Sequence, residues 1–243
     1  MNKIEKGKPA DYQDFIIFRR LEILKQFSGF FNPKLHLIDI GCGNGATLLN
    51  VFDQFSSCYG IDIEKERVQL FQNKLNENKI NNCTASVSDI NEQITHKNYY
   101  DRAISFEVLE HVENQNRALR NIYSCLKPGA QFAISVPNKW WIFETHGAHL
   151  PLLSWNRVPF FSWLPSFIHS RYAKARIYTK SKIKKTLIDN GFNIISCHYV
   201  MAPMDVVSIN WLQYFLRKTI FKNHSTSIPF MATSIMVFAE KPT

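Results

Sequence analysis

Cysteine is scarce in this chain and is not arranged as a metal site or a disulfide framework. Five cysteines are spread over 243 residues, and no two of them form a C-x-x-C pair. Zinc sites and disulfide-rich folds need closely spaced, paired cysteines, so the pattern argues against both. We expect reduced thiols in a cytoplasmic protein.

Long apolar runs are also missing. No stretch approaches the roughly 18 consecutive apolar residues of a membrane-spanning helix. Residues 1 to 11 are charged and lack the apolar core of a signal peptide. The sequence therefore predicts no membrane span, and it leaves peripheral contact with the inner face of a membrane as an open alternative.

Acidic residues are outnumbered by basic ones. The chain has 20 aspartates and glutamates against 29 lysines and arginines, a formal net charge of +9. Such a balance attracts anionic partners, either a membrane surface, a nucleic acid or an acidic substrate, without distinguishing among them. Length and a 45% apolar fraction suit one large α/β domain over residues 1–243.

The strongest local pattern is an apolar run that leads into three glycines at alternate positions, LIDIGCGNG over residues 37–45. Glycine tolerates a tight turn and a close backbone approach. We predict a strand before the glycines and a helix over 46–55 after them, which is the usual nucleotide cradle of a doubly wound sheet. Asp62 ends the next predicted strand, about 20 residues on, where an acid reaches a ribose hydroxyl.

The glycine spacing is G-x-G-x-G with Asp39 before it, and this differs from the dinucleotide pattern. It resembles the first motif of class I S-adenosylmethionine-dependent methyltransferases. Further segments match that family in order: Asp62, SDI at 88–90, YDRAISFEVLEHV at 100–112, and LKPGA at 126–130 with a strand to 137. The resemblance covers residues 35–138 and is nearest to the quinone-biosynthesis O-methyltransferases. It implies a seven-stranded, mostly parallel, Rossmann-like α/β sandwich with S-adenosylmethionine as cofactor.

The resemblance also implies a set of cofactor-binding residues. Asp39 would orient the loop or meet the amino group, Asp62 would accept the ribose hydroxyls, and Asp89 with Ile90 would bracket adenine. Asp62 could instead be a solvated acid, and Asp89 could instead cap a helix. The full set is Asp39, Gly41, Gly43, Asn44, Gly45, Asp62, Ile63, Ser88, Asp89, Ile90, Phe106 and Glu107.

Three histidines are candidate bases, because a hydroxyl acceptor must lose its proton near neutral pH. His111 follows the fourth predicted strand, and His146 and His149 follow the fifth. Each of them could instead be structural. Glu107, Glu110 and His111 with a later histidine also resemble the metal site of small-RNA 2′-O-methyltransferases. The same string occurs in metal-free relatives, so metal binding stays open.

Two segments depart from the resemblance, and we predict that they are insertions forming an acceptor-binding lid or a membrane face. Residues 139–178 hold ten aromatics broken by prolines, and residues 201–228 contain a predicted amphipathic helix over 205–221. Residues 171–185 add seven basic side chains and no acid, which favours an anionic membrane surface. The alternative is a closed lid with solvated lysines. Aromatics with basic residues also occur in RNA-binding proteins, but no RNA-binding module is recognisable, which argues against nucleic acid.

We therefore predict methyl transfer to a hydroxyl of a small apolar acceptor, a lipid or a prenylated quinone precursor at a membrane surface. Three alternatives stay open. They are a metal-dependent RNA 2′-O-methyltransferase, a small-metabolite O- or N-methyltransferase, and a non-catalytic protein of the same fold that binds the cofactor or a partner. The acceptor, the methylated atom and the oligomeric state do not follow from the sequence.

Overall fold

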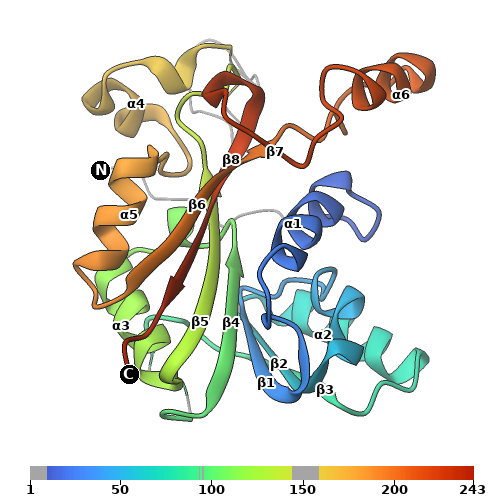
Figure 1. Cartoon of the computed structure of the whole chain (residues 1–243), viewed down its shortest axis with the longest axis vertical. Helices are drawn as coiled ribbons and strands as arrows, with labels where there is room; N and C mark the ends of the chain where they lie inside the picture. The colour runs from blue at the N-terminus through green and yellow to red at the C-terminus, as the bar shows by residue number, and fades with distance from the viewer. Residues whose placement is uncertain (1–9, 93, 95, 144–158) are drawn as a thin grey trace.

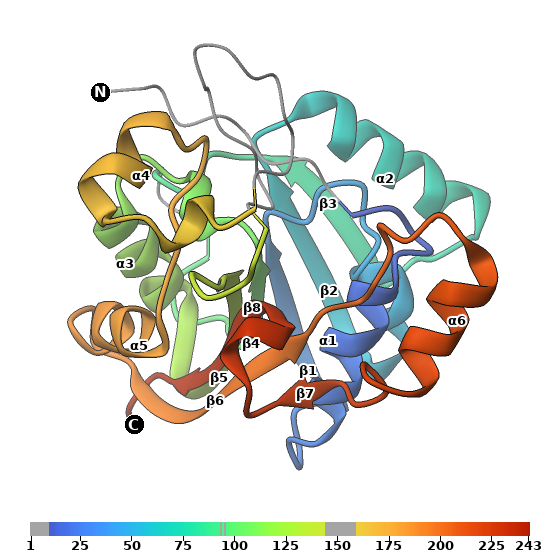
Figure 2. The same ribbon diagram turned by 90° about the horizontal axis from the view of Figure 1, so that it is seen from above.

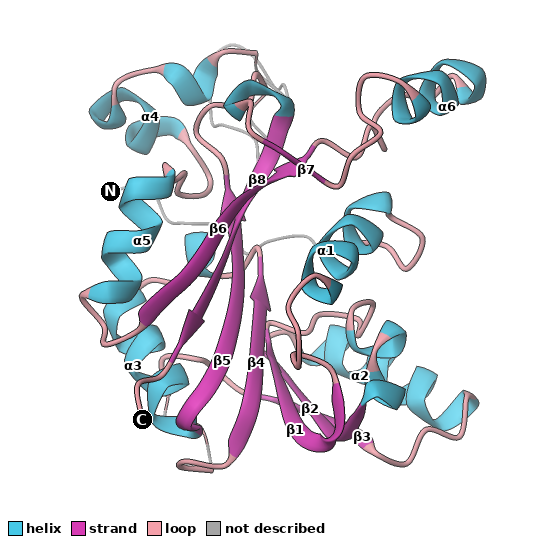
Figure 3. Ribbon diagram, viewed as in Figure 1, coloured by secondary structure: helices cyan, strands magenta, loops and turns pink. Residues whose placement is uncertain are grey.

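The computed structural model describes residues 10–92, 94, 96–143 and 159–243, and within them one sheet organises the molecule. Its strand order is β3-β2-β1-β4-β5-β8-β6-β7, with helices on both faces (Figures 1 and 3). The strands are β1 (Asn32–Ile40), β2 (Phe55–Asp62), β3 (Cys83–Val87), β4 (Tyr100–Phe106), β5 (Leu126–Pro137), β6 (Asn193–Met201), β7 (Ser225–Thr226) and β8 (Ala232–Glu240). The helices are α1 (Phe15–Lys25), α2 (Lys65–Glu77), α3 (Gln115–Cys125), α4 (Ser166–Tyr172), α5 (Lys180–Ile188) and α6 (Asn210–Lys218).

The pairing confirms the mostly parallel, Rossmann-like architecture. Strands β3, β2, β1, β4 and β5 run parallel, and β8 is antiparallel to both β5 and β6. The described part has eight strands where seven were predicted. The extra strand, β7, is two residues long and pairs with Tyr199 and Val200 of β6, so it is too short to leave a sequence pattern.

Apolar side chains fill both faces of the sheet. One cluster joins the sheet to α3 and α5 through residues such as Leu119 and Ile183, and the other joins it to α1 and α2 through Leu24 and Phe71. Strands covered on both faces read as continuous apolar runs, as β1 does before its glycines. The sheet is therefore the base of the molecule, and Figure 2 looks down onto the carboxyl ends of its parallel strands.

The predicted helix over 46–55 is wrong. The segment forms two 3-10 turns, Leu48–Asn50 and Phe52–Gln54, before β2 begins. The side-chain amide of Asn50 donates to the carbonyl of Ala46, the acceptor that its own backbone N–H would use in an α-helix. That N–H bonds Thr47 instead, which gives the tighter turn.

The described parts of the two predicted insertions lie beyond the carboxyl ends of the central strands (Figure 1). The described part of residues 139–178 contains only short elements, a 3-10 turn at Phe161–Trp163 and α4, as the prolines predict. In the second segment α6 is shorter than the predicted helix over 205–221. No helix among the described residues is long and apolar enough to cross a bilayer.

Candidate active site at the carboxyl ends of the strands

A cavity of about 1140 Å³ opens where β1, β2 and β4 end. The order of strands reverses between β1 and β4, and ligands of open α/β sheets bind at that point. His111 and most of the predicted cofactor residues line the cavity. These are Asp39, Gly41, Gly43, Asn44, Asp62, Ile63, Ser88, Asp89, Ile90, Phe106 and Glu107. The structure therefore brings the predicted set together, and its role in binding stays a prediction.

The glycine loop needs its glycines for packing as well as for access. Gly41 and Gly45 have φ values of +76° and +82°, a region that costs other residues energy. A Cβ on Gly41 would lie 2.2 Å from Val108, and one on Gly45 would lie 2.0 Å from the ring of Phe71. Gly45 is not in the described wall of the cavity, since it packs against α2. Its direct contact with a cofactor stays a prediction.

Asp62 is held in place by backbone donors. One carboxylate oxygen accepts from the N–H of Gly43 and the other from the N–H of Glu64, both at 2.9 Å. The acid therefore joins the glycine loop to the end of β2 and presents a fixed carboxylate at the cavity. This is the position from which an acid binds ribose hydroxyls in such folds.

Asp89 begins no helix among the described residues, so the alternative of a helix cap is wrong, and its contact with adenine stays a prediction. Its carboxylate accepts from the backbone N–H of Asn91 at 2.8 Å and so caps a turn. The same residue lines the cavity beside Ile90. Capping the turn and lining the cavity are thus compatible at this position.

Asp39 is a buried carboxyl group in the cavity wall. Burial raises its pKa to about 8, and the neighbouring charge of Asp62 adds to the shift. A carboxyl group in this state favours a cationic partner, which would restore its ionised form. S-adenosylmethionine carries positive charge on its sulfonium and amino groups, so the acid pair and the glycine loop fit this cofactor.

Arg20 is a cavity residue that the sequence analysis missed. Its guanidinium lies 2.9 Å from a carboxylate oxygen of Glu107, which also accepts from the hydroxyl of Ser135 at 2.9 Å. The contact ties α1 to β4 and β5. The sequence does contain a pattern that indicates its burial, because Arg20 falls in the buried stripe of Ile17, Leu21 and Leu24 at helical spacing.

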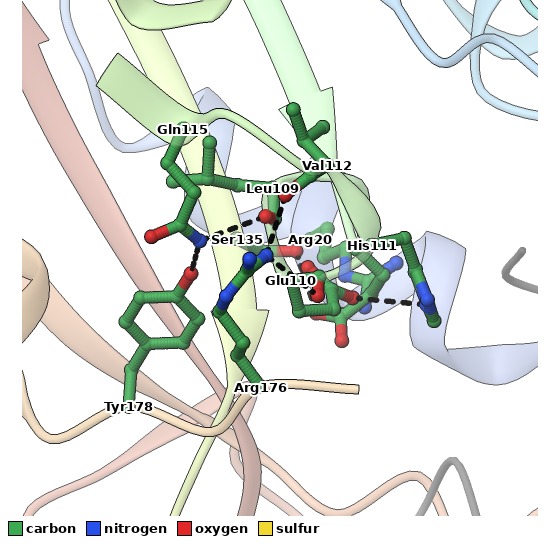
Figure 4. A network of polar contacts seen from close by, with 10 residues as sticks. Arg20, Leu109, Glu110, His111, Val112, Gln115, Ser135, Arg176 and Tyr178 are labelled. Carbon is green, nitrogen blue, oxygen red and sulfur yellow. Dashed lines mark hydrogen bonds and ion pairs between the residues drawn. The ribbon is translucent and has the colours of Figure 1, made fainter. Parts of the chain in front are cut away.

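The 3-10 turn Leu109–His111 carries the candidate base (Figure 4). His111 lines the cavity, and its Nε2 lies 3.8 Å from a carboxylate oxygen of Glu110. Glu110 is fully buried, and burial together with the charge of Glu107 holds its pKa well above the usual range. His146 and His149 lie outside the described residues, so one of the three candidate bases is placed at the cavity.

The described residues do not fit a metal ion. Among residues 10–92, 94, 96–143 and 159–243, no three His, Cys, Asp or Glu side chains are grouped as a metal site. Glu107, one of the candidate ligands, is engaged by Arg20 and Ser135. The metal-dependent RNA alternative therefore has no support in this part of the chain.

Side chains from the two predicted insertions also line the cavity. Trp141 and Phe143 come from the first, and Met204 and Val206 come from the second. Beyond the cavity the same segments expose further large apolar side chains. They include Trp140, Phe160, Trp163, Phe167, Ile209, Trp211, Tyr214, Phe215 and Ile220.

Comparison with known proteins shows the family of the chain. Residues 12–197 match the family model described as a methyltransferase domain, so the chain belongs to that family. It is an enzyme that uses S-adenosylmethionine. The chain is similar to the ubiquinone biosynthesis O-methyltransferase of Rickettsia canadensis (strain McKiel), with 27% identity over 82% of this chain and 85% of the relative.

Other relatives differ in what they do. Phosphoethanolamine N-methyltransferase 2 of Caenorhabditis elegans is 29% identical over 49% of this chain, and the match spans 27% of that longer protein. The solved S-adenosylmethionine-dependent methyltransferase from Mesorhizobium loti has a TM-score of 0.64 at 16% identity, covering 92% of this chain and 98% of that one. The [4+2]-cyclase SpnF has the same TM-score at 17% identity, covering 93% of this chain and 81% of that one. At such identity the likeness shows the fold alone, and one fold hosts several chemistries.

Proposed function

We propose that this enzyme transfers a methyl group to a hydroxyl of a small apolar molecule, a lipid or a prenylated quinone precursor, taken from a membrane surface. One observation carries the proposal. The acceptor side of the cavity is walled by Trp141, Phe143, Met204 and Val206, and the segments that provide them expose aromatic side chains outside. The similarity to a ubiquinone biosynthesis O-methyltransferase supports the same acceptor class.

The reaction requires the protein to align the acceptor oxygen with the methyl group and to remove one proton from the acceptor. Bound S-adenosylmethionine supplies a methyl group that is already activated on a sulfonium, so the acceptor oxygen has only to be held in line with it. His111 is the base that takes the hydroxyl proton from within the cavity wall. The carboxyl group of Glu110, 3.8 Å away, stabilises the resulting imidazolium when that carboxyl is ionised.

The membrane part of the proposal rests on α6. Leu216 packs inward against the cluster of Trp141 and Met204, while Trp211 and Tyr214 are 71% and 65% exposed. The last turn adds Lys218, whose ammonium lies 5.7 Å from the ring centroid of Tyr214. Exposed aromatics beside cations favour the boundary between headgroups and acyl chains, particularly of anionic lipid.

A series of acceptors tests the proposal. Catechol and 4-nonylcatechol are compared with and without phosphatidylglycerol vesicles. We expect kcat/KM to rise by at least about 10-fold with the alkyl chain, because several methylenes are buried at roughly 0.8 kcal/mol each. His111→Ala should lower kcat by roughly 100-fold or more at unchanged cofactor affinity. Equal kcat/KM for both acceptors would count against an apolar acceptor.

An amine acceptor is the second candidate, and the charge of the cavity favours it. Among the described residues, eight acidic side chains line the cavity against three arginines, although the whole chain is basic. The acids are Asp11, Asp14, Asp39, Asp62, Asp89, Glu107, Glu113 and Asp205. Such a lining attracts a cationic amine, and one relative is named a phosphoethanolamine N-methyltransferase. Methylation of nonylamine in preference to 4-nonylcatechol would promote this candidate.

A further inference from the structure

The turn that carries His111 is short and is not part of the sheet or of a long helix. It follows β4 and includes a 3-10 turn and the residues up to α3. Backbone carbonyls in such a segment need donors from elsewhere, since an unpaired buried carbonyl is costly. The carbonyls of residues 109, 110 and 112 obtain them from side chains (Figure 4), and so does the carbonyl of residue 113.

Arg176, from the end of the first insertion, supplies three of these contacts. One guanidinium nitrogen donates to the carbonyl of Val112 and lies 3.4 Å from that of Glu110. The other donates to the carbonyl of Glu113 at 3.1 Å. The backbone N–H of Arg176 also reaches the carbonyl of Glu110, at 3.3 Å. Arg176 therefore contacts backbone carbonyls that precede and follow His111 in the sequence.

The segment around Arg176 is itself firmly attached. The backbone N–H of Tyr178 donates to the carbonyl of Pro137 at the end of β5, and the N–H of Lys139 donates to the carbonyl of Tyr178. The Tyr178 hydroxyl accepts from Gln115, whose amide also donates to the carbonyl of Leu109 at 2.9 Å. The arginine thus connects a fixed part of the sheet to the turn.

We infer that Arg176 is a positioning residue for the proposed methyl transfer, which holds the turn of His111 so that its imidazole faces the acceptor. The inference rests on the proposed role of His111 as base. In the sequence Arg176 is one member of a basic run that favours a membrane surface. In the structure it lies in the cavity wall with its guanidinium on backbone carbonyls.

An arginine suits this task better than a lysine. Its planar fork offers five N–H donors in fixed directions, whereas an ammonium is a compact charge on a flexible stem. Arg176→Ala should lower kcat by roughly 10-fold to 100-fold, since a misplacement of about 1 Å can cost about that much. Arg176→Lys should recover part of the loss. The affinity for S-adenosylmethionine should stay within about 3-fold, because Asp62 and the glycine loop lie elsewhere on the cavity wall.

A double-mutant cycle with His111→Ala is the experiment. If Arg176 acts through His111, Arg176→Ala should cost less than about 3-fold in the His111→Ala background. Arg171→Ala is the matched control, because Arg171 is an exposed arginine of the same insertion that lies over Tyr172. The control should leave kcat unchanged. Additive losses in the cycle would overturn the inference.

A second measurement covers the case in which Arg176→Ala folds poorly. The imidazole NMR signals of His111 should shift or broaden in Arg176→Lys and stay unchanged in Arg171→Ala. Unchanged His111 signals in Arg176→Lys would contradict positioning. If His111→Ala lowers kcat and the Arg176 variants do not, this inference alone fails. If His111→Ala leaves kcat unchanged, the base assignment fails and the inference fails with it.

Discussion

The two halves of the cavity are built in different ways. The cofactor half consists of strand ends, a glycine loop and acids held by backbone N–H groups, as Asp62 is. The half where we propose that the acceptor binds, here called the acceptor half, consists of side chains from the two predicted insertions, such as Trp141 and Met204, and continues into exposed aromatics. We therefore expect the sheet to determine the cofactor and the loops placed on it to determine the acceptor. Four predictions test this contrast, from the largest expected effect to the smallest.

Asp39 should make the cofactor half sensitive to pH. Its native pKa of about 8 lies above the ordinary value of 3.8, so the native state binds the extra proton. The free energy of unfolding should therefore fall as pH rises from about 4 to about 8, by at most roughly 5 kcal/mol from this residue. In Asp39→Asn that contribution should vanish. Urea unfolding at pH 5 and pH 8 without cofactor measures it, and equal pH dependence in both proteins would contradict the prediction.

Gly45 should tolerate no side chain. A Cβ there would lie 2.0 Å from the buried ring of Phe71, and φ is +82°. Gly45→Ala should lower the free energy of unfolding by about 3 kcal/mol, from backbone strain and overpacking together. Gly29→Ala is the control, with φ of +76° and nothing within 4 Å of its Cβ, and should cost only about 1 kcal/mol. Similar losses in the two variants would show that packing against α2 is not what the loop requires.

Asp62→Ala should weaken S-adenosylmethionine binding by about 100-fold, because charge-assisted hydrogen bonds contribute roughly 1.5–3 kcal/mol each. The variant also frees the N–H of Gly43, so Asp62→Asn should lose less. Trp141→Ala, in the acceptor half, should leave the affinity within about 3-fold since no cofactor contact is expected there. Calorimetry measures all three. A loss in Trp141→Ala equal to that in Asp62→Ala would remove the division between the halves.

The exposed face of α6 should bind lipid without affecting the cofactor. Replacing both Trp211 and Tyr214 by serine should reduce partition onto phosphatidylglycerol vesicles by about 10-fold, through lost burial of aromatic surface. Leu70→Ser is the control, an exposed apolar residue on α2. Sedimentation with vesicles at low and high salt gives the result. Equal partition of the two variants would leave the aromatic face without a membrane role.

The cofactor half could be predicted from the sequence because its signals are local. A buried strand, three glycines and an acid about 20 residues on indicate one nucleotide-binding turn. The resemblance of this segment to methyltransferases implies the cofactor. The prediction for 46–55 failed because a single amide, Asn50, competes with the backbone for a carbonyl. The spacing of apolar residues in the sequence does not reveal such a side-chain contact. Seven strands were expected rather than eight because β7 has only two residues.

The cations at the cavity could not be predicted to the same depth because their contacts are long-range. Arg20 meets Glu107 across 87 positions of the chain, and Arg176 meets Val112 across 64. Arg20 falls in a buried helical stripe, which indicates its burial but not its partner, and Arg176 belongs to a basic run, which indicates a solvated or membrane-facing side chain. Only the packing of α1 and of the first insertion shows that both cations lie at the cavity.

Transfer of labelled methyl from S-adenosylmethionine into a cell extract tests the account most directly. The label is followed into the organic phase, the aqueous metabolites and RNA, with Asp62→Ala as the inactive control. If the acceptor is apolar, the label should enter the organic phase with the wild type, and almost no label should enter that phase with the variant. Label in RNA or in small aqueous metabolites, with none in the organic phase, would contradict an apolar acceptor.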